Sequence, residues 1–345
     1  MSSGDVATGT DGTSTGWSTT GGSTADLSRA GESTAAEPTE SDYHGHAAYR
    51  LASEHLWVDV LATAGPRIVR LGLAGSTRNL LAETPDIGWE TPHGRYDLLG
   101  GHRLWFAPED PDRVAVPDGD GLIVDIEPDG IRLTGRAEAP TGLVRSMTLR
   151  LLPDRAAFEL RHQLQNVADT PVELAPWSIT QLPLGGIVLL PQPPAAPGHH
   201  VRPNRMLVLW PYTSWEDPRL RPRDGLLSLD AIAGPSLKLG YFNDAGWVGY
   251  VRDGAVLVRR FEPLSGRAHA DLGCNVEVFV GRQFLELELL GPLTELAPGR
   301  SVSLVEEWDV EATDPVENYA DLRDLAGRIG RDQLGRADVL PWLVA

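Results

Sequence analysis

Short apolar runs separated by turn residues constrain the fold of this 345-residue chain more than any other feature. From Tyr49 onward, pairs of such runs flank turn signals at Gly65-Pro66, Pro128-Asp129-Gly130, Pro153-Asp154, Asn243-Asp244 and Asp253-Gly254. Two apolar runs around a tight turn are typical of a β-hairpin, and helical periodicity is almost absent from this region. The sequence therefore predicts an all-β fold, a large antiparallel sandwich or barrel of roughly a dozen strands.

The two ends of the chain have a different texture. Residues 1–42 are rich in Ser, Thr and Gly and bury too little apolar surface to offset the cost of ordering, so we expect a disordered tail. Near the other end, helical spacing is shared by Val316, Tyr319, Leu322, Leu325 and Ile329. We therefore expect a tail over 1–42, a β domain over 43–312 and a short C-terminal helical extension over 313–345.

Charge and cysteine content narrow the classes of partner. The formal net charge is −18, and an acidic surface repels phosphate backbones and anionic lipids, so we expect neither a nucleic-acid nor a membrane partner. No apolar run approaches the ~20 residues of a membrane helix. Cys274 is the only cysteine, and the start MSSGDVATGT lacks the pattern of a secretory signal, so the expected location is the cytoplasm.

The segment Asn275–Leu293 predicts a hairpin that carries acids on one face. Gly281-Arg282 fits a two-residue type II′ turn, which would place Glu277 opposite Glu286 and Asn275 opposite Glu288. Strand alternation then puts all four on one face. Either the face is solvated and the acids are harmless, or it is partly buried and suits a general base.

Other side chains suggest a binding site for a sugar. Trp105, Trp177 and Trp210 lie beside turns or loops, and indole rings stack well on the apolar face of a pyranose. Lys238 is the only lysine in the chain and alternates with leucines on a predicted strand.

The run Leu98–Pro111 raises a separate question, because it combines two glycines with charged and aromatic residues. Gly100-Gly101 would let the backbone approach a ligand and deliver His102, Arg103 and Trp105 to a cleft. A structural histidine and a core tryptophan are the alternative. The segment from Leu182 to Asp224 is rich in proline and predicts a long excursion, either a binding loop or a plain surface loop.

Several other kinds of site are not expected. The histidines that could join a metal site with nearby acids, at positions 93, 102, 199 and 200, show no tight ligand spacing. The chain also lacks a nucleophile elbow, a phosphate loop and a dinucleotide fingerprint. We therefore expect no metal and no cofactor.

Five segments together resemble a branch of the galactose mutarotase-like (aldose 1-epimerase-like) superfamily: GGHRLWFAPE, NVADTPVELAPWSITQLP, NRMLVLWPYTSWEDPRL, DLGCNVEVFVGRQFLELELLGPL and LAPGRSVSLVEEWDV. The resemblance covers roughly Tyr49 to Val310. It implies a β-supersandwich that binds sugars on its concave face. It also implies that a glutamate on a late strand acts as general base on the anomeric hydroxyl, at Glu288, with Glu286 as the second choice. It further implies that Arg103 lies near the substrate.

One departure from the family pattern affects the general acid. Where the family has a histidine followed by aromatic residues, this chain reads APWSITQ, so His102 is expected to act as the acid instead. Two functions stay open, an aldose 1-epimerase-like isomerase and a non-catalytic protein of the same fold that binds a small-molecule carbohydrate. The residues expected to contact the sugar are Arg103, Trp105, Trp177, Trp210, Lys238, Asn275, Glu277 and Glu286. The identity of the sugar and the oligomeric state are left open.

Overall fold

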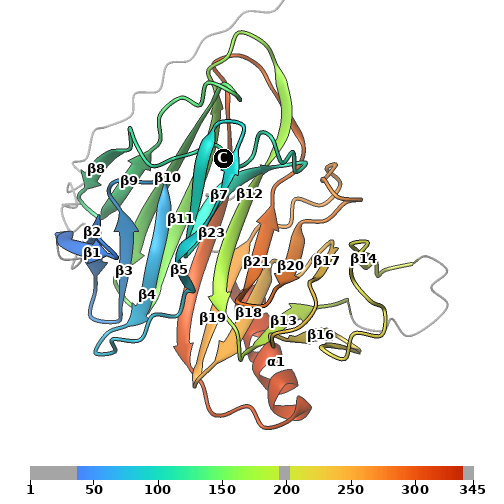
Figure 1. Ribbon diagram of the computed structural model, residues 1–345. Coiled ribbons are helices and arrows are strands. Elements are labelled where there is room, and N and C mark those ends of the chain that lie inside the picture. Colours follow the sequence, from blue (N-terminus) through green and yellow to red (C-terminus); the bar gives the residue numbers. More distant parts are fainter. Residues whose placement is uncertain (1–36, 194–202, 337–345) are drawn as a thin grey trace, which may run out of the picture. The chain divides into compact units, whose positions relative to one another are not determined.

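The computed structural model describes residues 37–193 and 203–336, which form two large antiparallel sheets, a two-stranded hairpin and one helix (Figure 1). Every strand pairing in this part of the chain is antiparallel, so the all-β prediction is confirmed. Two separate elements are the hairpin β5 (Glu83–Thr91) with β6 (Gly94–Gly100), and the helix α1 (Tyr319–Arg336).

Sheet I has eleven strands, with β22 (Thr294–Leu296) attached to β12 outside the main path. In spatial order the other strands are β1 (Thr39–Tyr43), β2 (His46–Ala52), β3 (Leu56–Leu61), β4 (Arg67–Leu73), β7 (His102–Ala107), β12 (Val172–Pro183), β21 (Phe284–Leu290), β20 (Val276–Val280), β17 (Leu237–Tyr241) and β14 (Val208–Leu209). Strands distant in sequence are therefore neighbours at the centre of this sheet.

Sheet II has ten strands. In spatial order they are β15 (Leu220–Arg223), β16 (Leu226–Asp230), β13 (Ile187–Pro191), β18 (Trp247–Arg252), β19 (Ala255–Phe261), β23 (Ser301–Ala312), β11 (Ala157–Asn166), β10 (Leu143–Leu152), β9 (Gly130–Thr134) and β8 (Ile123–Glu127).

The main hydrophobic core lies between the two sheets. Val278 and Leu287 of sheet I belong to one buried cluster with Phe158, Leu160 and Trp308 of sheet II. Because side chains alternate along a strand, the residues between these apolar positions on sheet I point the other way. We call the side of sheet I that faces sheet II its inner face, and the opposite side its outer face.

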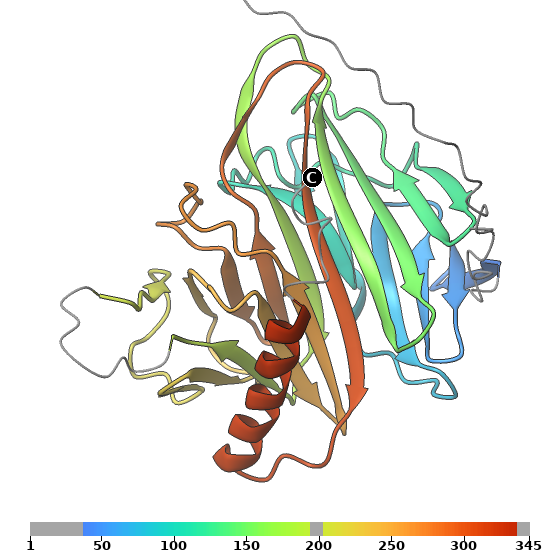
Figure 2. The same cartoon turned by 180° about the vertical axis from the view of Figure 1, so that it is seen from behind.

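The C-terminal helix packs on the side of sheet II that faces away from sheet I (Figure 2). Leu322, Leu325 and Ile329 form a buried cluster with residues of β13, β18 and β19, including Trp247. Asn318 caps the helix, because its Oδ1 accepts a hydrogen bond from the backbone N–H of Ala320 at 2.7 Å. The predicted C-terminal helix is thus confirmed. Within the described residues no helix has both the length and the apolarity needed to cross a bilayer.

Three local expectations differ from the structure. Strand β1 starts at Thr39, inside the segment expected to be a tail, while residues 1–36 lie outside the described part. Strand β13 is buried within sheet II, although its proline-rich surroundings suggested an excursion, because its own run IVLLP is apolar. The Asn243-Asp244 turn joins β17 of sheet I to β18 of sheet II, so it closes no hairpin.

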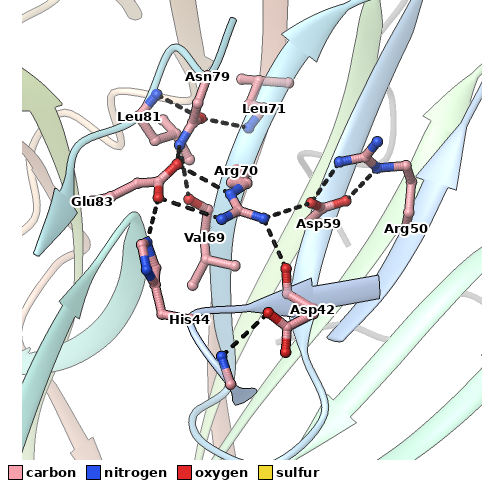
Figure 3. Close-up of polar contacts among 11 residues, drawn as sticks. Asp42, His44, Arg50, Asp59, Val69, Arg70, Leu71, Asn79, Leu81 and Glu83 are labelled. Carbon is pink, nitrogen blue, oxygen red and sulfur yellow. Dashed lines mark hydrogen bonds and ion pairs between the residues drawn. The ribbon is translucent and has the colours of Figure 1, made fainter. Parts of the chain in front are cut away.

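Ion pairs hold the first strands of sheet I to the start of β5 (Figure 3). Arg70 Nε donates to Glu83 Oε1 at 3.0 Å, and His44 Nε2 lies 2.6 Å from Glu83 Oε2. Farther along, Arg50 binds both oxygens of the buried Asp59 carboxylate at 2.6 and 2.8 Å. All of these groups are matched with partners, so the cluster serves to tie β1–β4 together.

The glycine pair before β7 packs against the protein's own backbone. Gly101 has a φ of +68°, and a Cβ placed there would lie 2.0 Å from the carbonyl oxygen of Ile68 in β4. The close approach that the Gly-Gly pair permits is therefore between strands, and the expectation that it serves a ligand is wrong.

Replacing Gly101 by alanine should lower the free energy of unfolding more than the same change at Gly75. Gly75 has a similar φ of +76° but no atom within 4 Å of its ideal Cβ, so Gly75→Ala costs only the ~1–2 kcal/mol of a left-handed L-residue. The clash at Gly101 adds ~1–3 kcal/mol. Urea denaturation of the two variants measures the difference, and equal losses would contradict the clash.

Candidate functional site

Most of the predicted site residues meet on the outer face of sheet I. Five adjacent strands, in the order β7-β12-β21-β20-β17, carry them. They are Arg103 and Trp105 of β7, Trp177 of β12, Glu286 and Glu288 of β21, Glu277 of β20 and Lys238 of β17, with Trp210 directly after β14. We call these eight residues the outer-face cluster.

The hairpin that carries the acids has a longer turn than its sequence suggests. Gly281 N–H donates to the carbonyl oxygen of Phe284 at 3.0 Å, and β20 pairs with β21 so that Glu277 lies opposite Glu288. The expected pairing of Glu277 with Glu286 is therefore wrong by two residues. Because a shift of two preserves the side-chain parity, the acids still share one face, as expected.

Lys238 lies at the centre of the cluster and contacts both opposed carboxylates. Its Nζ is 2.8 Å from Glu277 Oε2 and donates a hydrogen bond to Glu288 Oε2 at 3.0 Å. The same ammonium lies 4.8 Å from the ring centroids of Trp177 and of Trp210. Cation–π contacts of this kind stabilise a desolvated ammonium, so the two indoles and the two carboxylates together hold the lysine.

The two carboxylates have perturbed proton affinities. Glu277 and Glu288 are both fully buried, and Lys238 is 6% exposed. Burial and the Glu288 carboxylate raise the pKa of Glu277 to about 9, against the opposing effect of Lys238. Burial also raises the pKa of Glu288. Burial alone would lower the pKa of Lys238, but the Glu288 and Glu277 carboxylates together raise it, so the lysine stays protonated.

The cluster contains both free acceptors and free donors. Glu277 Oε1 and Glu288 Oε1 accept no hydrogen bond from the described residues, although both atoms are buried. Arg103 donates from Nη2 to Glu286 Oε1 at 2.9 Å, and its guanidinium carbon lies 4.4 Å from the ring centroid of Trp105. Its Nε and Nη1 have no hydrogen-bond partner among the residues that the structure describes. Buried polar groups are normally satisfied, so these atoms can accept and donate hydrogen bonds to a polyhydroxylated ligand.

Two further polar residues lie beside the cluster and were not predicted from the sequence. Gln181 lies opposite Glu286 on the outer face, and both polar atoms of its amide are buried without a partner in the described chain. Gln181 follows Trp177 by an even number of residues on the same strand, so the sequence could have placed both side chains on one face. Tyr212 is half-exposed on the segment after β14, where burial raises the pKa of its hydroxyl and Lys238 and Glu288 act on it electrostatically.

Asn275 is hydrogen-bonded to the protein's own backbone, and its expected role in binding stays a prediction. Its Oδ1 accepts from the backbone N–H of Asn243 at 2.7 Å, and its Nδ2 donates to the carbonyl oxygen of Asn243 at 3.2 Å. Both hydrogen bonds join the Asn275 amide to the backbone of the turn that follows β17. The side chain therefore fixes the end of the neighbouring strand.

The side chain of His102 points to the inner face of sheet I, away from Glu288. The expectation that His102 is the general acid for Glu288 is therefore wrong. Its Nδ1 lies 2.8 Å from Thr180 Oγ1, and its Nε2 lies 3.0 Å from His162 Nε2 of sheet II. Burial and the neighbouring His162 hold the pKa of His102 well below its usual value. Because neighbours along a strand face opposite ways, Arg103 can join the outer-face cluster only if His102 turns away from it.

The inner-face group around His102 is the one set of three His/carboxylate ligand atoms found within residues 37–193 and 203–336. It consists of His102, His162 and Glu306. The Glu306 carboxylate already accepts hydrogen bonds from Ser178 Oγ at 2.5 Å, Arg259 Nε at 2.8 Å and Trp308 Nε1 at 2.8 Å.

These bonds account for the buried Glu306 carboxylate without a metal ion. Of the other histidines considered for a metal, His93 contacts the backbone of Asp112, and residues 199 and 200 lie outside the described part.

Replacing His102 by glutamine should lower the free energy of unfolding by ~1–3 kcal/mol, because His162 loses a buried partner. His93→Gln, at an exposed position, should change it by less than ~0.5 kcal/mol. Urea denaturation at neutral pH measures both. A variant at His102 as stable as the wild type would contradict a structural role for this ring.

Comparison with known proteins supplies the fold. No protein-family model and no curated protein matches the sequence. A crystal structure of a TPR-domain containing protein from Parabacteroides distasonis ATCC 8503 aligns with 80% of this chain at 15% identity and a TM-score of 0.54. The match spans 48% of that protein, about half its length.

A second crystal structure, of a galactose mutarotase-like protein from Lactobacillus casei ATCC 334, aligns over its whole length. The match covers 76% of this chain and 100% of that chain, with 11% identity and a TM-score of 0.51. The chain has the galactose mutarotase-like fold. At these identities the comparison concerns the fold alone. This fold is the one that the sequence resemblance implied. The outer-face cluster lies on sheet I of this fold.

Proposed function

We propose that the protein binds a carbohydrate at the outer face of sheet I and interconverts its anomers, as an aldose 1-epimerase does. One observation carries the proposal. Glu277 and Glu288 form a buried carboxylate pair whose Oε1 atoms accept no hydrogen bond from the described residues, and the Lys238 that joins them contacts the rings of Trp177 and Trp210. Sugar sites combine hydrogen-bonding groups for the hydroxyls with aromatic faces for the C–H side of the ring.

Glu288 is the base in this proposal. Trp177 Nε1 and Lys238 Nζ both donate to its Oε2, at 2.8 and 3.0 Å, which fixes the carboxylate and leaves Oε1 to take a proton. Glu288 removes the proton of the anomeric hydroxyl while the ring oxygen is protonated, and the C1–O5 bond breaks. The open-chain aldehyde rotates about C1–C2 and closes again as the other anomer.

Arg103 serves the other end of the sugar. Ile179 lies between Arg103 and Glu288 on one rung of the sheet, so the two Cα atoms are about 10 Å apart at ordinary strand spacing. The unpaired Nε and Nη1 of Arg103 can donate to hydroxyls or to an anionic substituent there. Both carboxylates are fully buried, so entry of the sugar requires a movement of the residues that cover them.

The second candidate is a protein that binds a sugar without turnover. Two observations favour it. The predicted acid His102 faces away from Glu288, and Lys238 already occupies one oxygen of each carboxylate. The recognition groups of the outer-face cluster would be the same in this case.

Anomer exchange measured by NMR tests the proposal. The purified protein is added to glucose, galactose, glucuronate and glucose 6-phosphate, and exchange between the α and β anomeric protons is followed by saturation transfer. Exchange faster than the spontaneous rate for any of these sugars supports the epimerase. Line broadening without faster exchange supports the binding protein. Absence of both effects for the whole panel contradicts the proposed function.

A further inference from the structure

We propose that Glu277 and Glu288 share one proton, and that Glu277 is the proton donor to the ring oxygen of the sugar. The shared proton follows from the site alone. The donor role rests on the proposed function and supplies the acid that the turned-away His102 leaves unassigned.

The charge of the pair calls for a proton. Two fully buried carboxylates lie directly opposite each other across β20 and β21, and within the described part of the chain the single ammonium of Lys238 is the cation that bridges them. If both carboxylates were ionised, their two negative charges would exceed the single positive charge of Lys238. The remaining net negative charge would be buried away from water, which is strongly unfavourable. One proton on the pair removes that charge.

Among residues 37–193 and 203–336, no second cation pairs with Glu277 or Glu288. Glu286 lies on the same strand as Glu288, and its charge is paired with Arg103 at 2.9 Å. Asp271, in the loop before β20, adds a further negative charge that raises the pKa of Glu277. Arg259 of sheet II lies beyond the sheet and is held by Glu306 at 2.7 Å.

Two neutral groups lie within electrostatic reach of the pair, the thiol of Cys274 and the hydroxyl of Tyr212. Burial raises the pKa of each, so both keep their own protons.

The choice of donor depends on proton affinity. Lys238 is a poor acid, because both carboxylates stabilise its charged form and raise its pKa. Tyr212 and Cys274 also hold their protons more tightly than usual. A carboxylic acid is the strongest acid among these groups. Because Glu288 acts as the base, the protonated Glu277 is the best proton donor among these groups.

The geometry of the reaction restricts where the acid and the base lie. The anomeric oxygen and the ring oxygen are bonded to the same carbon, so a base and an acid that act on them together must lie side by side. Residues directly opposed on antiparallel strands have Cα atoms only ~4.5–5.5 Å apart. The free Oε1 atoms of Glu277 and Glu288 belong to such a pair.

The protons balance in this scheme. Glu288 takes the proton from the anomeric hydroxyl, the C1–O5 electron pair moves to the ring oxygen, and that oxygen takes the proton of Glu277. The pair holds one proton before and after ring opening, so Lys238 faces an unchanged charge throughout. Ring closure runs the same transfers in reverse on the opposite face of the aldehyde and restores the starting pair.

Infrared spectroscopy tests the shared proton without any need for turnover. At neutral pH the wild type should show a protonated carboxylic acid band. Glu277→Gln and Glu288→Gln should each remove it, since a single remaining carboxylate pairs with Lys238 and ionises. Glu286→Gln, a neighbouring change on the same face, should retain it. A wild-type spectrum without the band would overturn the proposal.

Kinetics test the donor role. Glu277→Gln should lower kcat for anomer exchange by ~10²–10⁴-fold and change KM by only a few-fold. The wild-type kcat should fall as the pH rises past the point at which the pair loses its shared proton, and the variant should lack that fall. Glu277→Asp keeps a carboxylic acid, and it should restore the infrared band and part of kcat. This second variant guards against a folding defect in the glutamine protein.

The remaining outcomes separate the two proposals. If the band is present and Glu277→Gln keeps the wild-type kcat, the donor role is wrong. If the band is present and the wild type exchanges no anomers on the panel, the proposed function and the donor role both fail. In that case the shared proton still stands on the infrared result.

Discussion

Replacing Glu288 by glutamine should lower the rate of anomer exchange by ~10²–10⁴-fold and leave sugar affinity within a few-fold of the wild type. Trp177 Nε1 donates to Glu288 Oε2 at 2.8 Å in the wild type. Glutamine keeps the shape of the side chain and an acceptor oxygen for this bond, but it cannot take the anomeric proton. The loss should therefore fall on kcat. NMR saturation transfer gives kcat, and chemical-shift titration gives the affinity.

Glu295→Gln is the matched control for this experiment. Glu295 is exposed on β22, which pairs with β12 at the end away from the carboxylates. The control should exchange anomers at the wild-type rate. If Glu288→Gln were as active as the control, Glu288 would not be the base. If it lost affinity together with activity, its carboxylate would serve recognition.

The largest expected loss of stability follows from Arg259→Met, at ~3–5 kcal/mol in the free energy of unfolding. Arg259 and Glu306 are both fully buried between the sheets, with Nη2 and Oε2 2.7 Å apart. Burial would raise the pKa of Glu306, but Arg259 and His162 hold it well below its usual value. Methionine leaves this carboxylate without its main partner.

Urea denaturation at neutral pH measures the effect, and a second change identifies its cause. Adding Glu306→Gln to Arg259→Met removes the unpaired charge and keeps an acceptor for Trp308, so part of the stability should return. Arg328→Met, which breaks an exposed pair with Glu311, should cost at most ~1 kcal/mol. Equal losses at Arg259 and Arg328 would contradict the buried-pair argument.

The proton linkage of Glu306 has a definite sign. Its folded pKa is lowered, so the stability it contributes is present above the pKa of the unfolded chain. That contribution is lost as the pH falls toward the folded pKa. Wild type and Arg259→Met should therefore differ most at neutral pH and converge in acid.

Local patterns in the sequence predicted much of the fold and part of the site. The hairpins at Gly65-Pro66, Pro128-Asp129, Pro153-Asp154 and Asp253-Gly254 are present, as is the C-terminal helix. These features depend on residues adjacent in the chain, where turn chemistry and periodicity act directly.

The grouping of Glu277, Glu286 and Glu288 on one face was also predictable, although their register was not. Side-chain parity in a strand is unchanged when the pairing shifts by two residues. Four residues, Gly281 to Phe284, separate the last cross-strand pair of Val280 and Leu285, where two residues were expected. The cross-strand partners of the acids therefore differ from the prediction, but the face on which the acids lie does not.

Most of the strands and turns, and the side chains that share a face, follow from the local sequence, because they depend on neighbours along the chain. The tertiary structure alone puts β7, β12, β21, β20 and β17 side by side, which brings Arg103 to the same face as Glu288 and places the ammonium of Lys238 between two carboxylates. It also decided that the outer face of β7 belongs to Arg103, which turns His102 into the core. The order of strands in a sheet and the face that is buried depend on contacts between distant segments, and no local pattern specifies them.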